Sequence, residues 1–262
     1  MVAKSLFEEI QSVAAFLQRR RGLIFFVFNL DSIFGSRGPD DPLYSKLVQQ
    51  IDWIQKASLF RVALFAGRPV HMQRQEFRDF RLIFIGSAGY EIDSPELSWQ
   101  FPGLSLVRQA LENVMDVLRM EMTGSDLRYA PTYNGISIEM KLGDMELPQQ
   151  NRITKLVQQA LGGTISPELT QTRTQITIGP RNMWNHGRAM ENFLRLWPRE
   201  KGEAPRLVYI GGDGSDETAY PIANRNGISV MIANGSKSAS TARYFVSNGR
   251  ELSKFLFWVQ SL

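Results

Sequence analysis

The stretch FFVFNLDSIFG, residues 25–35, decides the fold of this chain. Four consecutive apolar residues lead into a short polar segment, which is typical of a buried strand that ends at the edge of a sheet. Because side chains two residues apart in a strand point to the same face, we expect the Asn29 amide and the Asp31 carboxylate to lie side by side. Two carboxylates in these positions would indicate a phosphate-transfer site, so the amide at position 29 needs an explanation.

Length and composition indicate an ordinary globular protein. The chain has 262 residues, of which 43% are hydrophobic and 21% charged, and this is enough for one large domain or two small ones. No apolar run approaches the roughly 18–20 residues that span a bilayer, and Glu8 and Glu9 interrupt any secretory leader. We therefore expect a cytoplasmic protein without a membrane partner.

Cysteine, histidine and charge exclude several other kinds of site. The sequence has no cysteine and only two histidines, His71 and His186, so we expect neither disulfides nor a zinc site. The net charge is only +4, and the longest basic run, residues 19–21, lies at the end of an expected helix, where cations suit the helix dipole. We expect no nucleic-acid partner.

Apolar runs and helical periodicities alternate over most of the chain. Buried strands are expected at 23–28, 60–65, 82–86, 206–210 and 228–232. Helices are expected at 4–20, 43–57, 186–197, 217–224 and 250–261. This rhythm of strands and helices predicts an α/β fold built on a Rossmann-like parallel sheet.

The middle of the chain has a different pattern. Residues 104–120 and 152–161 have helical periodicity, whereas 135–141 and 173–178 alternate apolar and polar residues, as half-exposed antiparallel strands do. This α+β pattern predicts a module inserted into the sheet domain.

Two domains are therefore expected. A core domain is formed by 1–102 and 180–262, and an inserted cap domain by 103–179. Pro-Gly at 102–103 and Gly-Pro at 179–180 are the best candidates for the boundaries.

Three expected strand ends carry residues suited to binding a ligand. They are Asn29 with Asp31, Ala66-Gly67-Arg68, and Gly212-Asp213 with Asp216. In an open parallel sheet, ligands bind beyond the carboxyl ends of the strands. Carboxylates at such an edge usually hold Mg²⁺ next to a phosphate, because the cation offsets the repulsion between an anionic nucleophile and the phosphate.

Six stretches resemble, in the same order, the motifs of one protein family. They are VFNLDSIF (27–34), VALFAGRP (62–69), FIGSAGYEI (84–92), GISIEMK (135–141), YIGGDGSDETAY (209–220) and STARYFV with ELSKFLFWV (240–246 and 251–259). The first resembles the D-x-D-G-T-L motif of the haloacid-dehalogenase superfamily, and the set resembles its trehalose-6-phosphate phosphatases. The resemblance implies a haloacid-dehalogenase core with an inserted α+β cap, a sugar-phosphate substrate and Mg²⁺ as cofactor.

The same resemblance implies that groups used for catalysis have changed. Asn29 stands where the family has its aspartate nucleophile, whereas Asp31 keeps the position of the general acid/base. Ala66 replaces the serine that binds the phosphate, and His186 replaces the lysine that neutralises it. An amide is a poor nucleophile. When catalytic groups act as a unit, the loss of any one of them lowers the rate greatly.

Two further changes affect the metal site and its surroundings. Ala88 replaces a family histidine, and Gly212 replaces the aspartate that holds the metal. Asp213 and Asp216 remain as candidate Mg²⁺ ligands, although acids just before an expected helix are also ordinary N-terminal caps.

Other candidate residues have a structural interpretation beside the functional one. Asp31 fits a backbone cap at a strand end or a residual acid/base. Arg68 fits a local ion pair or a phosphate contact. Glu139 and Lys141, on one face of an expected strand, fit an exposed ion pair or, as the resemblance implies, contacts to sugar hydroxyls.

The preferred interpretation is a trehalose-6-phosphate phosphatase-like protein that has lost catalysis. It would sense a sugar phosphate, regulate, or bind a partner protein such as a glycosyltransferase of the same pathway. The alternative is an active Mg²⁺-dependent phosphatase, acting on trehalose-6-phosphate or a related sugar phosphate, that uses its remaining carboxylates in a rearranged site.

Overall fold

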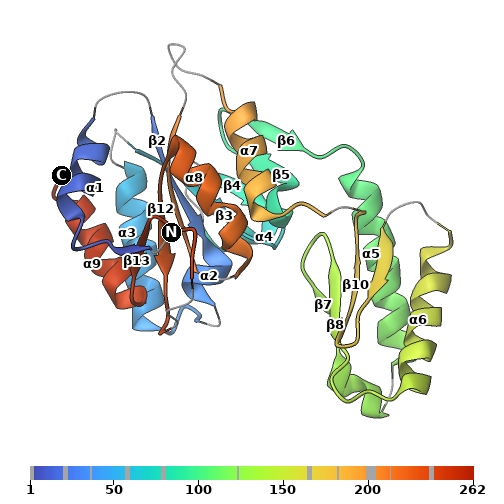
Figure 1. Cartoon of the computed structure of the whole chain (residues 1–262). Coiled ribbons are helices and arrows are strands. Elements are labelled where there is room, and N and C mark those ends of the chain that lie inside the picture. The colour runs from blue at the N-terminus through green and yellow to red at the C-terminus, as the bar shows by residue number, and fades with distance from the viewer. Residues whose placement is uncertain are drawn as a thin grey trace. The chain divides into compact units, whose positions relative to one another are not determined.

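The chain is divided into two compact units (Figure 1). The first consists of Met1–Ala66, Val70–Trp99 and Trp184–Leu262, and the second of Gly67–Pro69 and Gln100–Met183. The computed structural model describes residues 3–19, 23–35, 37–56, 60–77, 81–122, 124–163, 167–181, 183–198, 205–212, 214–235 and 239–262.

A large sheet forms the centre of the first unit. Within the described residues it has nine strands, in the order β1-β13-β12-β11-β2-β3-β4-β5-β6. Neighbouring strands from β1 to β4 run parallel, and β5 is antiparallel to β4. The bounds are β1 (Lys4–Ser5), β2 (Ile24–Asn29), β3 (Phe60–Phe65), β4 (Ile83–Gly86), β5 (Glu91–Asp93), β6 (Ser98–Gln100), β11 (Arg206–Gly211), β12 (Gly227–Ile232) and β13 (Tyr244–Val246).

Helices lie on both faces of this sheet (Figure 1). Their bounds are α1 (Ile10–Gln18), α2 (Leu30–Phe34), α3 (Pro42–Lys56), α4 (Val70–Glu76), α7 (His186–Leu196), α8 (Tyr220–Asn226) and α9 (Gly249–Val259), with 3₁₀ turns η1 (Ser87–Gly89) and η4 (Gly214–Thr218).

The central strands are buried on both faces, and their side chains alternate between two hydrophobic layers. In β2, Phe26 and Phe28 belong to the layer that also contains residues of α1, α3 and α9. Phe25 and Val27 belong to the opposite layer, with residues of α7 and α8. A strand with no face in water needs an apolar residue at every position, which explains the unbroken run before Asn29.

Two predicted helices differ from the structure. The helix expected at 4–20 begins only at Ile10, because Lys4 and Ser5 pair with Tyr244 and Phe245 of β13. The helix expected at 217–224 is replaced by η4 followed by α8. In both places the chain contacts a distant segment, since Glu217 of η4 accepts hydrogen bonds from Ser240 and Thr241.

The second unit has an antiparallel sheet in the order β7-β8-β10-β9 and two helices that pack together. The bounds are α5 (Leu104–Glu121), η2 (Gly124–Tyr129), β7 (Thr132–Tyr133), β8 (Ile138–Lys141), α6 (Leu147–Leu161), β9 (Glu168–Gln171) and β10 (Gln175–Gly179). Ile138 and Met140 of β8 are buried, whereas Glu139 is half-buried and Lys141 exposed. The alternation predicted for this strand therefore gives one apolar and one polar face.

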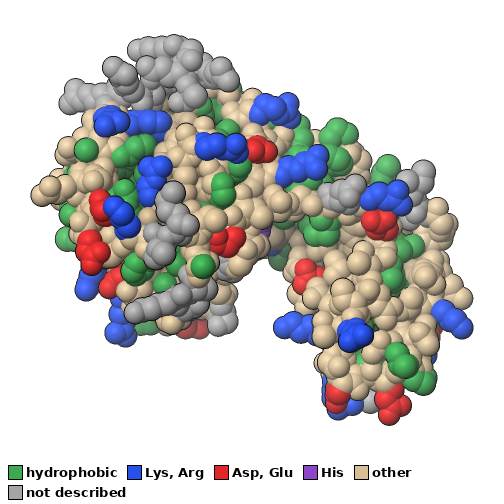
Figure 2. Space-filling model, in the orientation of Figure 1, with side chains coloured by type: hydrophobic (Ala, Val, Ile, Leu, Met, Phe, Trp, Pro, Cys, Tyr) green, Lys and Arg blue, Asp and Glu red, His purple; other side chains and the backbone are tan. Residues whose placement is uncertain are grey.

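The predicted α/β fold with a parallel core sheet is confirmed. None of the helices in the described ranges is both long and apolar enough to cross a membrane. On the face that Figure 2 shows, Lys and Arg side chains are scattered and Asp and Glu lie among them.

Candidate functional site

Asn29 is the last residue of β2 and the N-cap of α2. Its side chain is fully buried, with 0% of its surface exposed. The Oδ1 atom accepts a hydrogen bond from the backbone N–H of Asp31 at 3.1 Å, and the Nδ2 atom donates to Asp216 Oδ1 at 2.8 Å. The Asp31 backbone N–H can only donate and the ionised Asp216 carboxylate can only accept. The hydrogen bonds therefore determine which end of the Asn29 amide is oxygen and which is nitrogen.

Asp31 does not lie beside Asn29 on the strand, as we expected from their spacing. The strand ends at Asn29, and Asp31 lies exposed in the first turn of α2. The change from extended to helical backbone at this point ends the two-residue alternation that the prediction used.

Partial desolvation, with the Asp31 carboxylate nearby, raises the pKa of Glu76 on α4.

Asp216 is the centre of the site, and its carboxylate is fully buried. Its Oδ1 atom accepts hydrogen bonds from Asn29 Nδ2 at 2.8 Å and from Tyr209 Oη at 2.6 Å, and His186 Nδ1 lies 3.1 Å away. Its Oδ2 atom accepts from Ser32 Oγ at 2.8 Å and from the Gly212 backbone N–H at 2.7 Å. An ionised carboxylate only accepts, so His186 donates from Nδ1.

These hydrogen bonds keep Asp216 ionised although it is buried. Burial by itself would raise the pKa of the Asp216 carboxyl, but hydrogen bonds from His186, Tyr209 and Asn29 outweigh it. They hold the pKa well below its usual range. The interpretation of Asp216 as a helix cap is wrong, because its oxygens accept from side chains of other elements and from the backbone N–H of Gly212, and α8 has Ala219 as its N-cap.

The strand pattern explains why these groups converge. Tyr209 of β11 is paired with Val27 of β2, and both belong to the layer that α7 covers. Asn29 lies two residues beyond Val27 and so points to the same side. His186 opens α7 on this side, and its ring packs edge-on against Phe65, 4.7 Å between centroids.

A glycine makes room for the carboxylate. A Cβ atom at Gly211 would lie 2.3 Å from Asp216 Oδ2, which is closer than real Cβ contacts allow. The end of β11 therefore needs glycine for steric reasons, although its φ is not in the left-handed region.

Ala66 follows β3 and is linked to β4 and to the turn η1 by backbone hydrogen bonds. Its N–H donates to Ile85 O at 3.0 Å, and its carbonyl accepts from Ala88 N at 3.1 Å. Ala88 and its neighbour Ser87 both have positive φ angles, 53° and 48°. Glu91 holds this strained turn by accepting from Ser87 Oγ and from Val70 N. Methyl groups at 66 and 88 offer no hydrogen bond to a phosphate.

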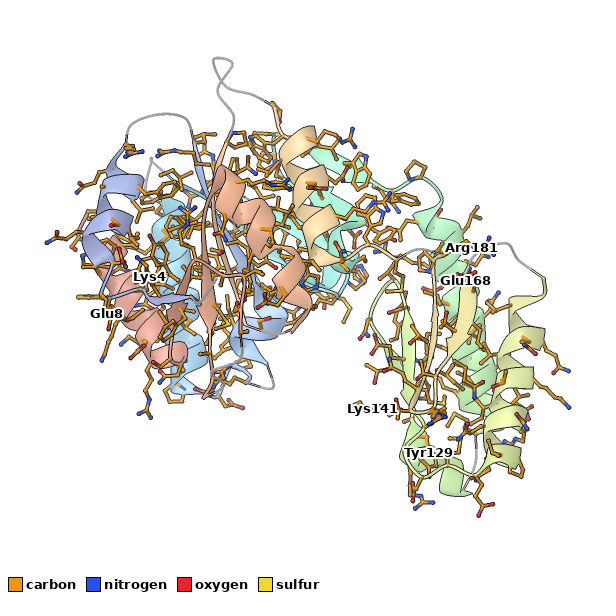
Figure 3. The ribbon with its side chains drawn as sticks, in the orientation of Figure 1. Lys4, Glu8, Tyr129, Lys141, Glu168 and Arg181 are labelled. Carbon is orange, nitrogen blue, oxygen red and sulfur yellow. The ribbon has the colours of Figure 1, made fainter. Side chains whose placement is uncertain are left out.

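The remaining predicted site residues lie in the second unit or outside the described residues. Arg68 belongs by its contacts to the second unit, with Gly67 and Pro69. Glu139 and Lys141 lie on the polar face of the second sheet, where Glu139 is in register with Thr177 (Figure 3 labels Lys141). Asp213 lies outside the described residues, so the structure says nothing of its predicted role.

Comparisons with known proteins agree with this architecture. No family model matches the chain. Trehalose-phosphate phosphatase B of Arabidopsis thaliana is 22% identical over 269 residues, covering 97% of this chain and 69% of that protein. The fold matches solved trehalose-6-phosphate phosphatase from Aspergillus fumigatus with a TM-score of 0.62 at 13% identity, over 99% of this chain and 100% of the other. It also matches the C-terminal domain of Candida albicans trehalose synthase regulatory protein, with a TM-score of 0.60 at 14% identity, over 98% and 99%.

The chain is similar over nearly its whole length to a trehalose-phosphate phosphatase and has the haloacid-dehalogenase fold. The resemblance seen in the sequence motifs is thereby confirmed. Asn29 and Asp216 both come from stretches that resemble motifs of these phosphatases, and both lie at the carboxyl edge of the sheet.

The residues present do not fit the Mg²⁺ that a trehalose-phosphate phosphatase-like site implies. Mg²⁺ requires oxygen ligands at about 2.0–2.1 Å in octahedral geometry. Both Asp216 oxygens already accept hydrogen bonds, and the one Asn29 oxygen accepts from the backbone. Among the residues that the structure describes, no three His, Asp, Glu or Cys side chains converge as a metal site. The arrangement is a hydrogen-bonded anion, not a cation site.

Sequence reasoning missed two members of the buried cluster around Asp216, Ser32 and Tyr209. Both lie inside motif stretches, but their hydroxyls were not considered as donors. A usable signal was available: a buried carboxylate without a cation requires donors, and these hydroxyls occur in α2, just after β2, and within β11.

Proposed function

We propose that this chain is a non-catalytic trehalose-6-phosphate phosphatase-like protein that binds a sugar phosphate and has a regulatory or partner-binding role. One observation carries the proposal: the position of the family nucleophile holds Asn29, whose amide nitrogen is engaged with Asp216. Phosphoryl transfer to this position needs an anionic oxygen that is free to attack. Neither atom of this amide meets that requirement.

The neighbouring changes act in the same direction. Ala66 and Ala88 have methyl groups where the family has a phosphate-binding hydroxyl and a histidine. His186, in the place of the lysine, donates its Nδ1 proton to Asp216. In enzymes whose catalytic groups act as a unit, removing one group costs several orders of magnitude in rate. Together the changes support a chain that has stopped turning over substrate.

The polar face of the second sheet supports a binding role. Glu139 lies between Thr132 of β7 and Thr177 of β10 in register, and Lys141 is in register with Gln175. This row combines an acceptor, a cation, an amide and hydroxyls, which suits the hydroxyl groups of a sugar. The same fold occurs in the C-terminal domain of a trehalose synthase regulatory protein. A glycosyltransferase of trehalose synthesis is therefore the preferred partner class.

Phosphate release tests the loss of catalysis. The unaltered chain is incubated with trehalose-6-phosphate, with and without Mg²⁺, and inorganic phosphate is measured, with a trehalose-phosphate phosphatase as positive control. We expect no release above the uncatalysed background under either condition. Mg²⁺-dependent release at multiple turnovers would reject the proposal in favour of an active phosphatase with rearranged carboxylates.

Calorimetric titration with trehalose-6-phosphate, trehalose and inorganic phosphate tests the binding role. We expect Glu139→Gln and Lys141→Met to weaken binding by about tenfold or more, since a hydrogen bond to a charged group contributes about 1.5–3 kcal/mol. Glu146→Gln and Lys155→Met are matched controls, because both side chains are exposed and belong to the N-cap and the body of α6. Equal affinity in all four variants would exclude this face.

A further inference from the structure

The Asp216 cluster joins parts of the first unit that are far apart in the sequence. Asn29 and Ser32 lie 187 and 184 residues from Asp216, and both donate to its carboxylate. Tyr209 adds β11, and His186 adds the first residue of α7. A single buried charge therefore connects β2, α2, β11, η4 and α7. Contacts of such large sequence separation constrain the fold more than local ones do.

The cluster satisfies the Asp216 carboxylate with hydrogen bonds, without a cation. A carboxylate has about four lone-pair positions, and donors from five residues surround the two oxygens of Asp216. If position 29 carried a carboxylate, two anions would meet in a buried site where one of these hydrogen bonds now exists. Such a pair is stable only with a cation or a shared proton between its members.

We propose that the Asp216 cluster is a metal-independent structural centre that excludes divalent cations, with Asn29 as the residue that decides between the two states. In this chain the hydrogen bonds hold the strand ends together, and no cation contributes to stability. Replacing the Asn29 amide by a carboxylate converts the cluster into a site that needs a cation. This goes beyond the proposed function, because it concerns the stability and ion selectivity of the site whether or not a sugar phosphate binds.

Thermal unfolding followed by tryptophan fluorescence tests this proposal. The unaltered chain is unfolded in EDTA and in millimolar MgCl₂, CaCl₂ or MnCl₂, and we expect melting temperatures equal to within about 1 °C. We expect Asn29→Asp to melt more than about 5 °C lower in EDTA, and Mg²⁺ to restore a measurable part of that loss. Asn248→Asp is the matched control, since aspartate can also cap α9 and the variant should not respond to cations.

A second variant and a direct binding measurement keep the proposal testable if Asn29→Asp does not fold. Ser32→Ala removes one donor and changes no charged group, so we expect it to fold, melt lower and remain unresponsive to Mg²⁺. Mn²⁺ binding is followed by its electron paramagnetic resonance signal, and we expect none to the unaltered chain at submillimolar concentrations. Stoichiometric Mn²⁺ binding, or a Mg²⁺-induced rise in the melting temperature of the unaltered chain, would overturn the proposal.

The outcome is separable from that of the proposed function. Cation binding without phosphate release would overturn the metal-independent centre and leave the non-catalytic assignment in place. Phosphate release that persists in EDTA would overturn the non-catalytic assignment and leave the metal-independent centre in place.

Discussion

Replacing Asp216 by asparagine should destabilise the first unit strongly, although the two side chains have nearly the same shape. The variant has one acceptor oxygen and one NH₂ group. In one orientation its NH₂ group faces the donors of Asn29, Tyr209 and His186, and in the other it faces those of Ser32 and Gly212. At least two buried donors lose their acceptor in either orientation.

The size of the effect follows from the hydrogen bonds that change. An unsatisfied buried donor costs about 1–3 kcal/mol, and breaking a buried charged network typically costs about 3–5 kcal/mol. We therefore expect the free energy of unfolding to fall by about 3–5 kcal/mol. For a unit of this size, that corresponds to a melting temperature lower by roughly 6–20 °C.

The assay can be restricted to the first unit, because all five tryptophans belong to it. They are Trp53, Trp99, Trp184, Trp197 and Trp258. Urea unfolding followed by tryptophan fluorescence therefore reports this unit and gives a free energy and a slope m.

The control for this experiment is Asp52→Asn, which removes an exposed carboxylate from the ion pair with Lys56 and should change stability by less than about 0.5 kcal/mol. If Asp216→Asn unfolded within about 1 kcal/mol of the unaltered chain with an unchanged m, the argument that this carboxylate organises the unit would be refuted.

Three further predictions concern steric fit, the second unit and pH. Gly211→Ala should lower the stability of the first unit by about 1–3 kcal/mol in the same urea assay, because the new Cβ would meet Asp216 Oδ2; an unchanged midpoint would contradict the close approach. Leu118→Ala removes a fully buried side chain of α5 and should cost the second unit about 2–5 kcal/mol; the loss should appear in circular dichroism at 222 nm and not in tryptophan fluorescence, and its appearance in both would show that the units unfold together. The pKa of Glu76 is raised in the folded chain, so its stabilising contribution is full below its usual value of about 4.5 and is lost as pH rises through the folded value. The Glu76→Gln variant should therefore have the same melting temperature as the unaltered chain at low pH and a higher one at neutral pH. Equal melting temperatures at every pH would contradict a raised pKa for Glu76.

The polar faces and the strand interiors of this protein could be predicted from the sequence. The predicted strand at 60–65 coincides with β3, and the helix expected at 104–120 lies within α5. These predictions succeed because a strand covered on both faces must be apolar throughout, and a helix covered on one face must be apolar at helical spacing. Both patterns can be recognised from residues that are close together in the sequence.

The first residues of the chain show where this reasoning ends. Their helical spacing predicted a helix from residue 4, but Lys4 and Ser5 form an edge strand on β13, which lies more than two hundred residues further along the chain. No local pattern marks that partner. The hydrogen bonds of an edge strand come from the neighbouring strand, so tertiary structure decides whether such a short segment is a strand.

By itself, the sequence determined the α/β fold, the antiparallel pattern of the second unit and the presence of an amide at position 29, because each depends on residue type and near-neighbour spacing. Only the tertiary structure decided what Asp216 does. A carboxylate just before a helix is ordinarily an exposed cap, and nothing nearby in the sequence distinguishes it from one. Its role depends on donors from β2, α2, β11 and α7 that reach the same point in space, and the energy of a buried charge is set by those neighbours in space.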